Sequence, residues 1–154
     1  MLLVMSKIAP ELFSDESLAG LRGSKPLRLD SKVWRLLGKV FWNFIKYYGL
    51  KQNQAAGLLS LSSESRKTLK EFEENQNVPH TEEIALRIIQ LLSINKNLAL
   101  LYPHNKEIIE TWMRTPKSFL HEETPIDHIL KGPGLGPLTR IFEVRRILDQ
   151  IRVR

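Results

Sequence analysis

Cysteine is absent from the 154 residues, which excludes disulfides and thiolate metal sites and is typical of a protein from the reducing cytoplasm. The apolar opening at residues 1–5 is too short for the hydrophobic region of a signal peptide, and no apolar run approaches the length of a membrane span. The four histidines lack the i, i+4 pairing that builds a zinc site on a helix. These absences predict a soluble cytoplasmic protein that binds no metal and no membrane.

Residues for catalysis are also lacking. Asp127 and His128 are adjacent, so on a helix their side chains diverge, and no nucleophile motif accompanies them. Gly134 and Gly136 follow no predicted strand and lack the third glycine of a dinucleotide-binding fingerprint. We therefore predict a protein that is not an enzyme and carries no cofactor.

Positive charge is abundant and unevenly placed. Eleven basic and two acidic residues lie between Arg22 and Lys70, a net charge of +9, which leaves −3 for the rest of a chain whose total is +6. A basic segment of this kind fits contact with phosphates, and an acidic remainder fits contact with protein. By charge alone, a solvated basic surface is an equal alternative.

Apolar residues recur at three- and four-residue steps along most of the chain, and no segment alternates as a strand does. The pattern predicts an all-α fold: an arm over 1–28, a first domain over 29–78 and a second over 79–154. Capping signals at Asp30, Ser62, Thr81 and Thr124 set helix starts. The expected helices cover 31–48, 51–59, 63–74, a segment from 82, a separate one from Asn95 to 102, and segments after 105, 124 and 136.

Residues 50–65 carry the pattern of a helix-turn-helix. Such a motif needs a small residue where its second helix crosses the first, and Ala55 supplies it. It also needs a tight turn, usually through glycine, followed by an inward-facing hydrophobe, and Ser60 and Leu61 occupy these places. The second helix would then insert its first residues into the major groove of DNA.

On this interpretation seven residues meet DNA. Arg66 suits direct readout, because its fork matches the two major-groove acceptors of guanine. Lys67 and Lys70 suit phosphates, and the start of the first helix can also reach phosphate. The predicted DNA-binding residues are Gln52, Asn53, Ser63, Glu64, Arg66, Lys67 and Lys70. The alternative is a helical hairpin with an exposed polar face.

The second half of the chain resembles an antitoxin family. Residues 81–94 (TEEIALRIIQLLSI) and 98–103 (LALLYP) are similar to the opening of the Xre/MbcA/ParS-type antitoxin domain. Residues 112–116 (WMRTP), 124–130 (TPIDHIL) and 138–152 resemble, in order, its later segments. With the helix-turn-helix, the similarity covers residues 30–152. The loop over 117–123 lacks the family's usual asparagine and paired glycines, and the GPGLG connection at 132–136 is unusual.

The resemblance implies the antitoxin of a type II toxin–antitoxin pair. Its partner would be a RES-domain toxin that consumes NAD, whose active-site entrance the second domain would cover. The first domain, as a homodimer, would bind double-stranded operator DNA and repress the operon. The residues that the resemblance assigns to toxin binding are Trp112, Arg114, Pro125, Ile126, Arg145, Arg146 and Arg152. Trp112 fits a core position better, and the three arginines after residue 144 fit a solvated face equally well.

One alternative of a different class stays open. A stand-alone helix-turn-helix regulator, whose second domain only dimerises or senses a ligand, would have the same basic first half. A purified homodimer that binds an operator without a protein partner would indicate this function.

Overall fold

The computed structural model describes residues 29–62, 65–132 and 136–153. These residues are mostly helical, with one isolated bridge between Lys117 and Glu123 and no strand, so the all-α prediction is confirmed. The predicted arm over 1–28 lies outside the described residues. The elements are α3 (Ser31–Tyr47), α4 (Gln52–Leu58), α5 (Arg66–Glu74), α6 (Glu82–Leu101), α7 (Lys106–Thr111), the 3₁₀ turns η2 (Trp112–Arg114) and η3 (Ser118–Leu120), α8 (Pro125–Leu130) and α9 (Pro137–Val153).

Three helices begin where the sequence predicts. Side-chain oxygens of Asp30, Thr81 and Thr124 accept hydrogen bonds from the backbone N–H three residues later, at 2.9, 3.2 and 3.2 Å. Gly49, which follows α3, has φ +61°, a conformation that glycine adopts at little cost. These local signals set α3, α6 and α8.

Two predicted helix starts are wrong. The sequence predicts a helix that begins at Ser63 with Ser62 as its cap, but the helix begins at Arg66, after Ser65. The hydroxyls of Ser62 and Ser65 lie 3.0 Å apart. The helix expected to begin at Asn95 does not exist, because α6 continues through that residue. Asn95 is buried and its Oδ1 accepts a 2.6 Å hydrogen bond from the Tyr48 hydroxyl, so its side chain joins two helices instead of capping one.

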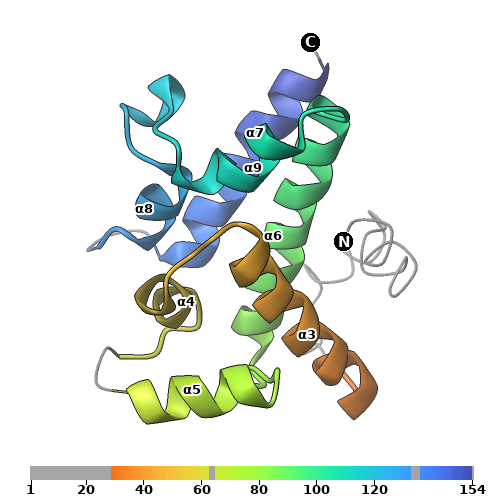
Figure 1. The fold of residues 1–154 in the computed structure, drawn as a ribbon, viewed down its shortest axis with the longest axis vertical. Helices are drawn as coiled ribbons and strands as arrows, with labels where there is room; N and C mark the ends of the chain where they lie inside the picture. The colour runs from red at the N-terminus through yellow and green to blue at the C-terminus, as the bar shows by residue number, and fades with distance from the viewer. Residues whose placement is uncertain (1–28, 63–64, 133–135, 154) are drawn as a thin grey trace.

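α6 is the central helix of the fold. In Figure 1 it spans most of the height of the molecule, with α9 beside it, α3 and α4 near its lower half, α5 below them, α7 near its upper end and α8 beside α9. Side chains join α6 to α9 at two levels: Arg145 Nη1 donates to Gln90 Oε1 at 2.6 Å, and Asn97 Nδ2 donates to Asp149 Oδ1 at 2.9 Å. The second bond lies further along the chain than the first on both helices, so α6 and α9 run in the same direction.

A single apolar cluster joins the two parts of the chain. It runs from Trp34 on α3 to Leu148 on α9 and includes seven residues of α6. α4 also packs on α8, because Gly57 leaves room for the Leu130 side chain. By length and composition alone α6 could cross a membrane, but 67% of its apolar window is buried inside the fold, as in the core helix of a soluble protein.

Candidate nucleic-acid interface

The turn after α4 has the geometry that the sequence predicts. Ala55 is fully buried at the centre of α4, and Ser60 takes a left-handed backbone with φ +56°. The Leu61 N–H then donates to the Ala56 carbonyl at 2.9 Å, which ends the helix in a Schellman-type turn. The chain therefore turns at the end of α4 without glycine.

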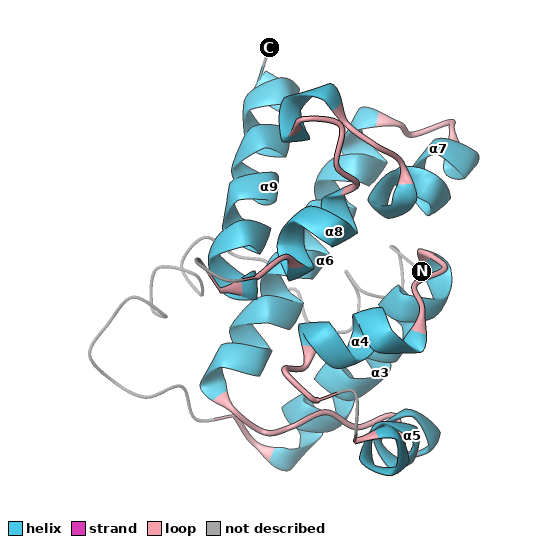
Figure 2. Cartoon of the chain, turned by 90° about the vertical axis from the view of Figure 1, so that its left-hand side faces the viewer, coloured by secondary structure: helices cyan, strands magenta, loops and turns pink. Residues whose placement is uncertain are grey.

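α5 is the most exposed of the longer helices. Only Leu69 is fully buried, and Phe72, three residues later, packs against the core from the same side. Arg66, Lys67 and Lys70 are all exposed. Figure 2 shows α5 at the outer edge of the molecule, seen nearly end-on beside α3 and α4. The predicted cations thus lie on an outward-facing helix.

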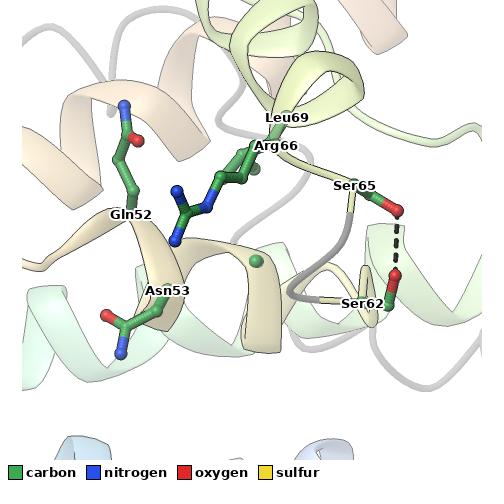
Figure 3. Close-up of a pocket in the computed structure, with 7 residues that line it drawn as sticks. Gln52, Asn53, Ser62, Ser65, Arg66 and Leu69 are labelled. Carbon is green, nitrogen blue, oxygen red and sulfur yellow. Dashed lines mark hydrogen bonds between the residues drawn. The ribbon is translucent and has the colours of Figure 1, made fainter.

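A hollow separates the start of α5 from α4. Its volume is about 470 Å³, and it is lined by Gln52, Asn53, Ala56, Ser62, Ser65, Arg66 and Leu69. Figure 3 shows the Arg66 guanidinium reaching from α5 toward Gln52 and Asn53 of α4. Three of the predicted DNA-binding residues, from two helices, therefore share one opening.

The polar side chains in and near this hollow differ in whether they make hydrogen bonds or ion pairs. Within the part of the chain that the structure describes, the side chains of Arg66, Lys67 and Asn53 make no hydrogen bond or ion pair. Gln52 Nε2 donates to Glu73 Oε2 at 3.1 Å, across the gap between α4 and α5. Lys70 Nζ lies 3.9 Å from Glu74 Oε1, with both side chains mostly exposed, and such a pair is worth little.

Charge divides α5 along its length. The cations Arg66, Lys67 and Lys70 occupy its first five residues, and Glu71, Glu73 and Glu74 occupy its last four. The helix dipole adds partial positive charge at the first end. An anion is therefore attracted to the start of α5 and repelled from its end. Ser63 and Glu64, the other two predicted DNA-binding residues, lie outside the described residues.

The residues that the resemblance assigns to a toxin do not form one patch. Trp112 is 3% exposed and Ile126 1%, and Pro125 is also buried. Lys117 Nζ lies 5.1 Å from the centroid of the Trp112 ring, and burial lowers the pKa of this lysine. Arg114 is exposed, but its Nε donates to the Tyr48 carbonyl at 2.9 Å.

Three arginines of α9 fall into two groups. Arg145 is turned inward, with Nη1 on Gln90 and its Nε 3.6 Å from the Asp149 carboxylate. Arg146 and Arg152 are exposed, and no hydrogen bond or ion pair joins the side chain of either one to another described residue. Of the predicted toxin contacts on α9, these two are the ones that a partner could reach without rearrangement.

The loop after η3 holds two residues in a backbone that favours glycine. His121 and Glu122 have φ values of +55° and +66°. Beside it, Glu123 accepts from Lys131 Nζ at 3.2 Å and lies 3.5 Å from His128 Nδ1, and these contacts, the lysine first, lower the pKa of Glu123. His128 Nε2 lies 3.0 Å from Glu143 Oε2, so the ring links this loop to α9.

One polar residue near the α4–α5 turn is not singled out by the sequence pattern. Arg87, on α6, is 3% exposed and contacts the turn through its guanidinium. An arginine at an apolar position of a helix is a signal that sequence reasoning can use, because such a charge needs partners when buried.

No protein-family model matches the chain, and a search of curated proteins finds no match.

Proposed function

We propose that α4, the turn at Ser60 and α5 form a helix-turn-helix that binds double-stranded DNA. The observation that carries the proposal is the exposed group of Arg66, Lys67 and Lys70 on an outward-facing helix, with Gln52 and Asn53 beside it. A small buried alanine and a left-handed turn residue match what this motif requires. Residues 29–78 are the DNA-binding domain on this proposal, and 79–154 the partner-binding domain.

Arg66 would read a base and Lys67 a phosphate. The fork of Arg66 suits the O6 and N7 acceptors of guanine, whereas Lys67 offers a point charge that any sequence satisfies. Only the first half of α5 is basic, so the acidic end of the helix would point away from the phosphates. Such motifs act as dimers on half-sites about one helical turn apart, so a two-fold symmetric operator is expected.

We further propose that the protein is the antitoxin of a type II pair, represses its own operon and neutralises a RES-domain toxin. The order of segments over residues 81–152 supports this proposal, as does the separation of a basic first half from a nearly neutral second half. Arg146 and Arg152 are exposed and unengaged among the described residues, which suits contact with a partner. Trp112 and Ile126 are buried, so on this proposal they belong to the core of the second domain and do not contact the toxin directly.

Two experiments test the two parts. For the DNA part, sites are selected from random duplexes: Arg66→Ala should lose preference at one base pair, at a cost of about 1–3 kcal/mol, whereas Lys67→Ala should weaken binding to all duplexes. An unchanged base preference in Arg66→Ala would contradict the assignment of Arg66 to a base contact.

For the partner part, the gene adjacent to this one is expressed with and without the antitoxin. We expect growth arrest alone, rescue on co-expression and a stable complex on purification. A neighbour that leaves growth unaffected would contradict the antitoxin function and favour a stand-alone regulator.

A further inference from the structure

The α4–α5 turn is held by a residue that lies 27 positions further along the chain. Arg87 Nη1 donates to the Ser60 Oγ and to the Leu58 carbonyl, both at 2.8 Å, and Nη2 lies 3.2 Å from Glu83 Oε1. The Leu58 carbonyl belongs to the last turn of α4, where carbonyls lack helical partners. The guanidinium therefore caps α4 and grips the turn residue that follows it.

The backbone conformation of Ser60 explains why the turn needs the hydrogen bond from Arg87. Its φ of +56° is a conformation that side chains other than glycine adopt at a cost. A hydroxyl can accept the arginine N–H, whereas glycine at this position would fit the backbone but offer no acceptor. Serine at this position therefore has a less favourable backbone conformation than glycine would have, but it accepts a hydrogen bond from Arg87 of α6.

Burial rules out a direct contact between Arg87 and DNA. The residue is 3% exposed, and its Nε is buried without a hydrogen-bond partner among the described residues. A charge so placed is retained against a large desolvation penalty, and its partners are at the turn and one exposed carboxylate. Any effect of Arg87 on DNA binding must therefore pass through the turn.

We propose that Arg87 is a positioning residue for DNA recognition: it clamps the Ser60 turn to the core helix α6 and so fixes the direction in which α5 presents Arg66 and Lys67. The inference rests on the proposed DNA-binding function. α5 itself buries only Leu69, so its own packing orients it weakly. The Arg87 hydrogen bonds connect the turn before α5 to α6, the most buried helix of the fold.

The test uses a pair of substitutions at Ser60 that both suit a left-handed backbone. Ser60→Gly removes the acceptor, whereas Ser60→Asn keeps an acceptor oxygen. We expect Ser60→Gly to melt at or above the wild-type temperature and yet to raise the Kd for DNA by about three- to thirtyfold, with Ser60→Asn close to wild type. The salt dependence of Kd should not change, because no phosphate contact is lost.

Variants on α6, at the other end of the Ser60 hydrogen bond, provide a second test and a control. Arg87→Lys should weaken DNA binding as Ser60→Gly does, whereas Glu83→Gln, which removes the exposed carboxylate and leaves both turn bonds, should bind like wild type. Wild-type affinity in both Ser60→Gly and Arg87→Lys would overturn the positioning role.

Amide hydrogen exchange separates this inference from the proposed function. The Leu61 N–H is bonded to Ala56 across the turn, and it should exchange faster in Arg87→Lys than in wild type or Glu83→Gln. If the wild-type protein binds no duplex, the proposed function fails, and exchange alone decides whether Arg87 holds the turn. Equal exchange in all three proteins would overturn the clamp.

Discussion

α5 and α6 are consecutive helices with opposite relations to the core. Twelve of the twenty residues of α6 are buried, but of the nine in α5 only Leu69 is. A helix as buried as α6 is constrained by packing, so its sequence reports the fold. A helix as exposed as α5 contributes little to folding, and on the proposed function its cations serve DNA binding. The difference is between a buried central helix and an exposed helix that precedes it in the chain.

The largest expected effect comes from the centre. Ile94 is fully buried on α6, and Ile94→Ala should lower the free energy of unfolding by about 2–5 kcal/mol, because it removes apolar contacts and leaves a cavity. The matched change on α5 is Thr68→Ala, at an exposed position, which should stay within about 0.5 kcal/mol of wild type. Urea unfolding of both variants measures the contrast, and equal losses would contradict it.

The next effect concerns the linker between the two helices. Gly38 of α3 lies under the chain at Gln76, and a Cβ at residue 38 would clash with the Gln76 backbone carbonyl. Gly38→Ala should therefore cost about 1–3 kcal/mol, since backbone must move. Gly132→Ala is the control, because a Cβ there meets nothing within 4 Å. Thermal melts of the pair measure the effect, and equal melting temperatures would show that the linker yields freely.

A smaller effect belongs to the polar contact that ties α3 to α6. Tyr48→Phe removes the hydrogen bond to Asn95 and should cost about 0.5–1.5 kcal/mol at neutral pH. Burial raises the pKa of Tyr48 above its usual 10.0, and burial followed by Glu110 raises the pKa of Tyr47. The unfolded chain then ionises first, so the free energy of unfolding should fall as pH rises above about 10.

In Tyr48→Phe the alkaline fall should be shallower, because one of the two tyrosines no longer titrates. Urea midpoints at neutral pH and above pH 10 check this. A fall of the same size in both proteins would mean that the Tyr48 hydroxyl ionises freely in the fold.

The smallest effect lies in the loop between η3 and α8. Glu122→Gly relieves a φ of +66° and should stabilise the protein by about 0.5–1 kcal/mol. Ser118→Gly, in the neighbouring η3 and without a positive φ, should not stabilise. Thermal melts compare the two, and a loss of stability in Glu122→Gly would show that the Glu122 side chain makes a favourable contribution that outweighs its backbone cost.

Sequence reasoning succeeded where structure is local. The caps at Asp30, Thr81 and Thr124 and the turn residue Ser60 depend on the chemistry of a few neighbouring residues. The exposed placement of Arg66, Lys67 and Lys70 also follows from the spacing of Leu69 and Phe72.

The error at Asn95 and the omissions at Arg145 and Arg87 involve partners far along the chain. Asn95 continues a helix because Tyr48, 47 residues earlier, binds its side chain. Arg145 turns inward because Gln90 faces it from α6, and Arg87 binds a turn 27 residues before it. Periodicity assigns a polar residue to a face but does not identify its tertiary partner.

Salt-dependent DNA binding by two doubly substituted proteins tests the central claim most directly. Lys67→Ala/Lys70→Ala and Arg146→Ala/Arg152→Ala each remove two positive charges, one pair on α5 and the other on α9. The first should weaken binding to every duplex and flatten the slope of log K against log salt by about two units, and the second should leave the slope unchanged. Equal slopes in the two proteins would show that the cations of α5 do not contact the duplex.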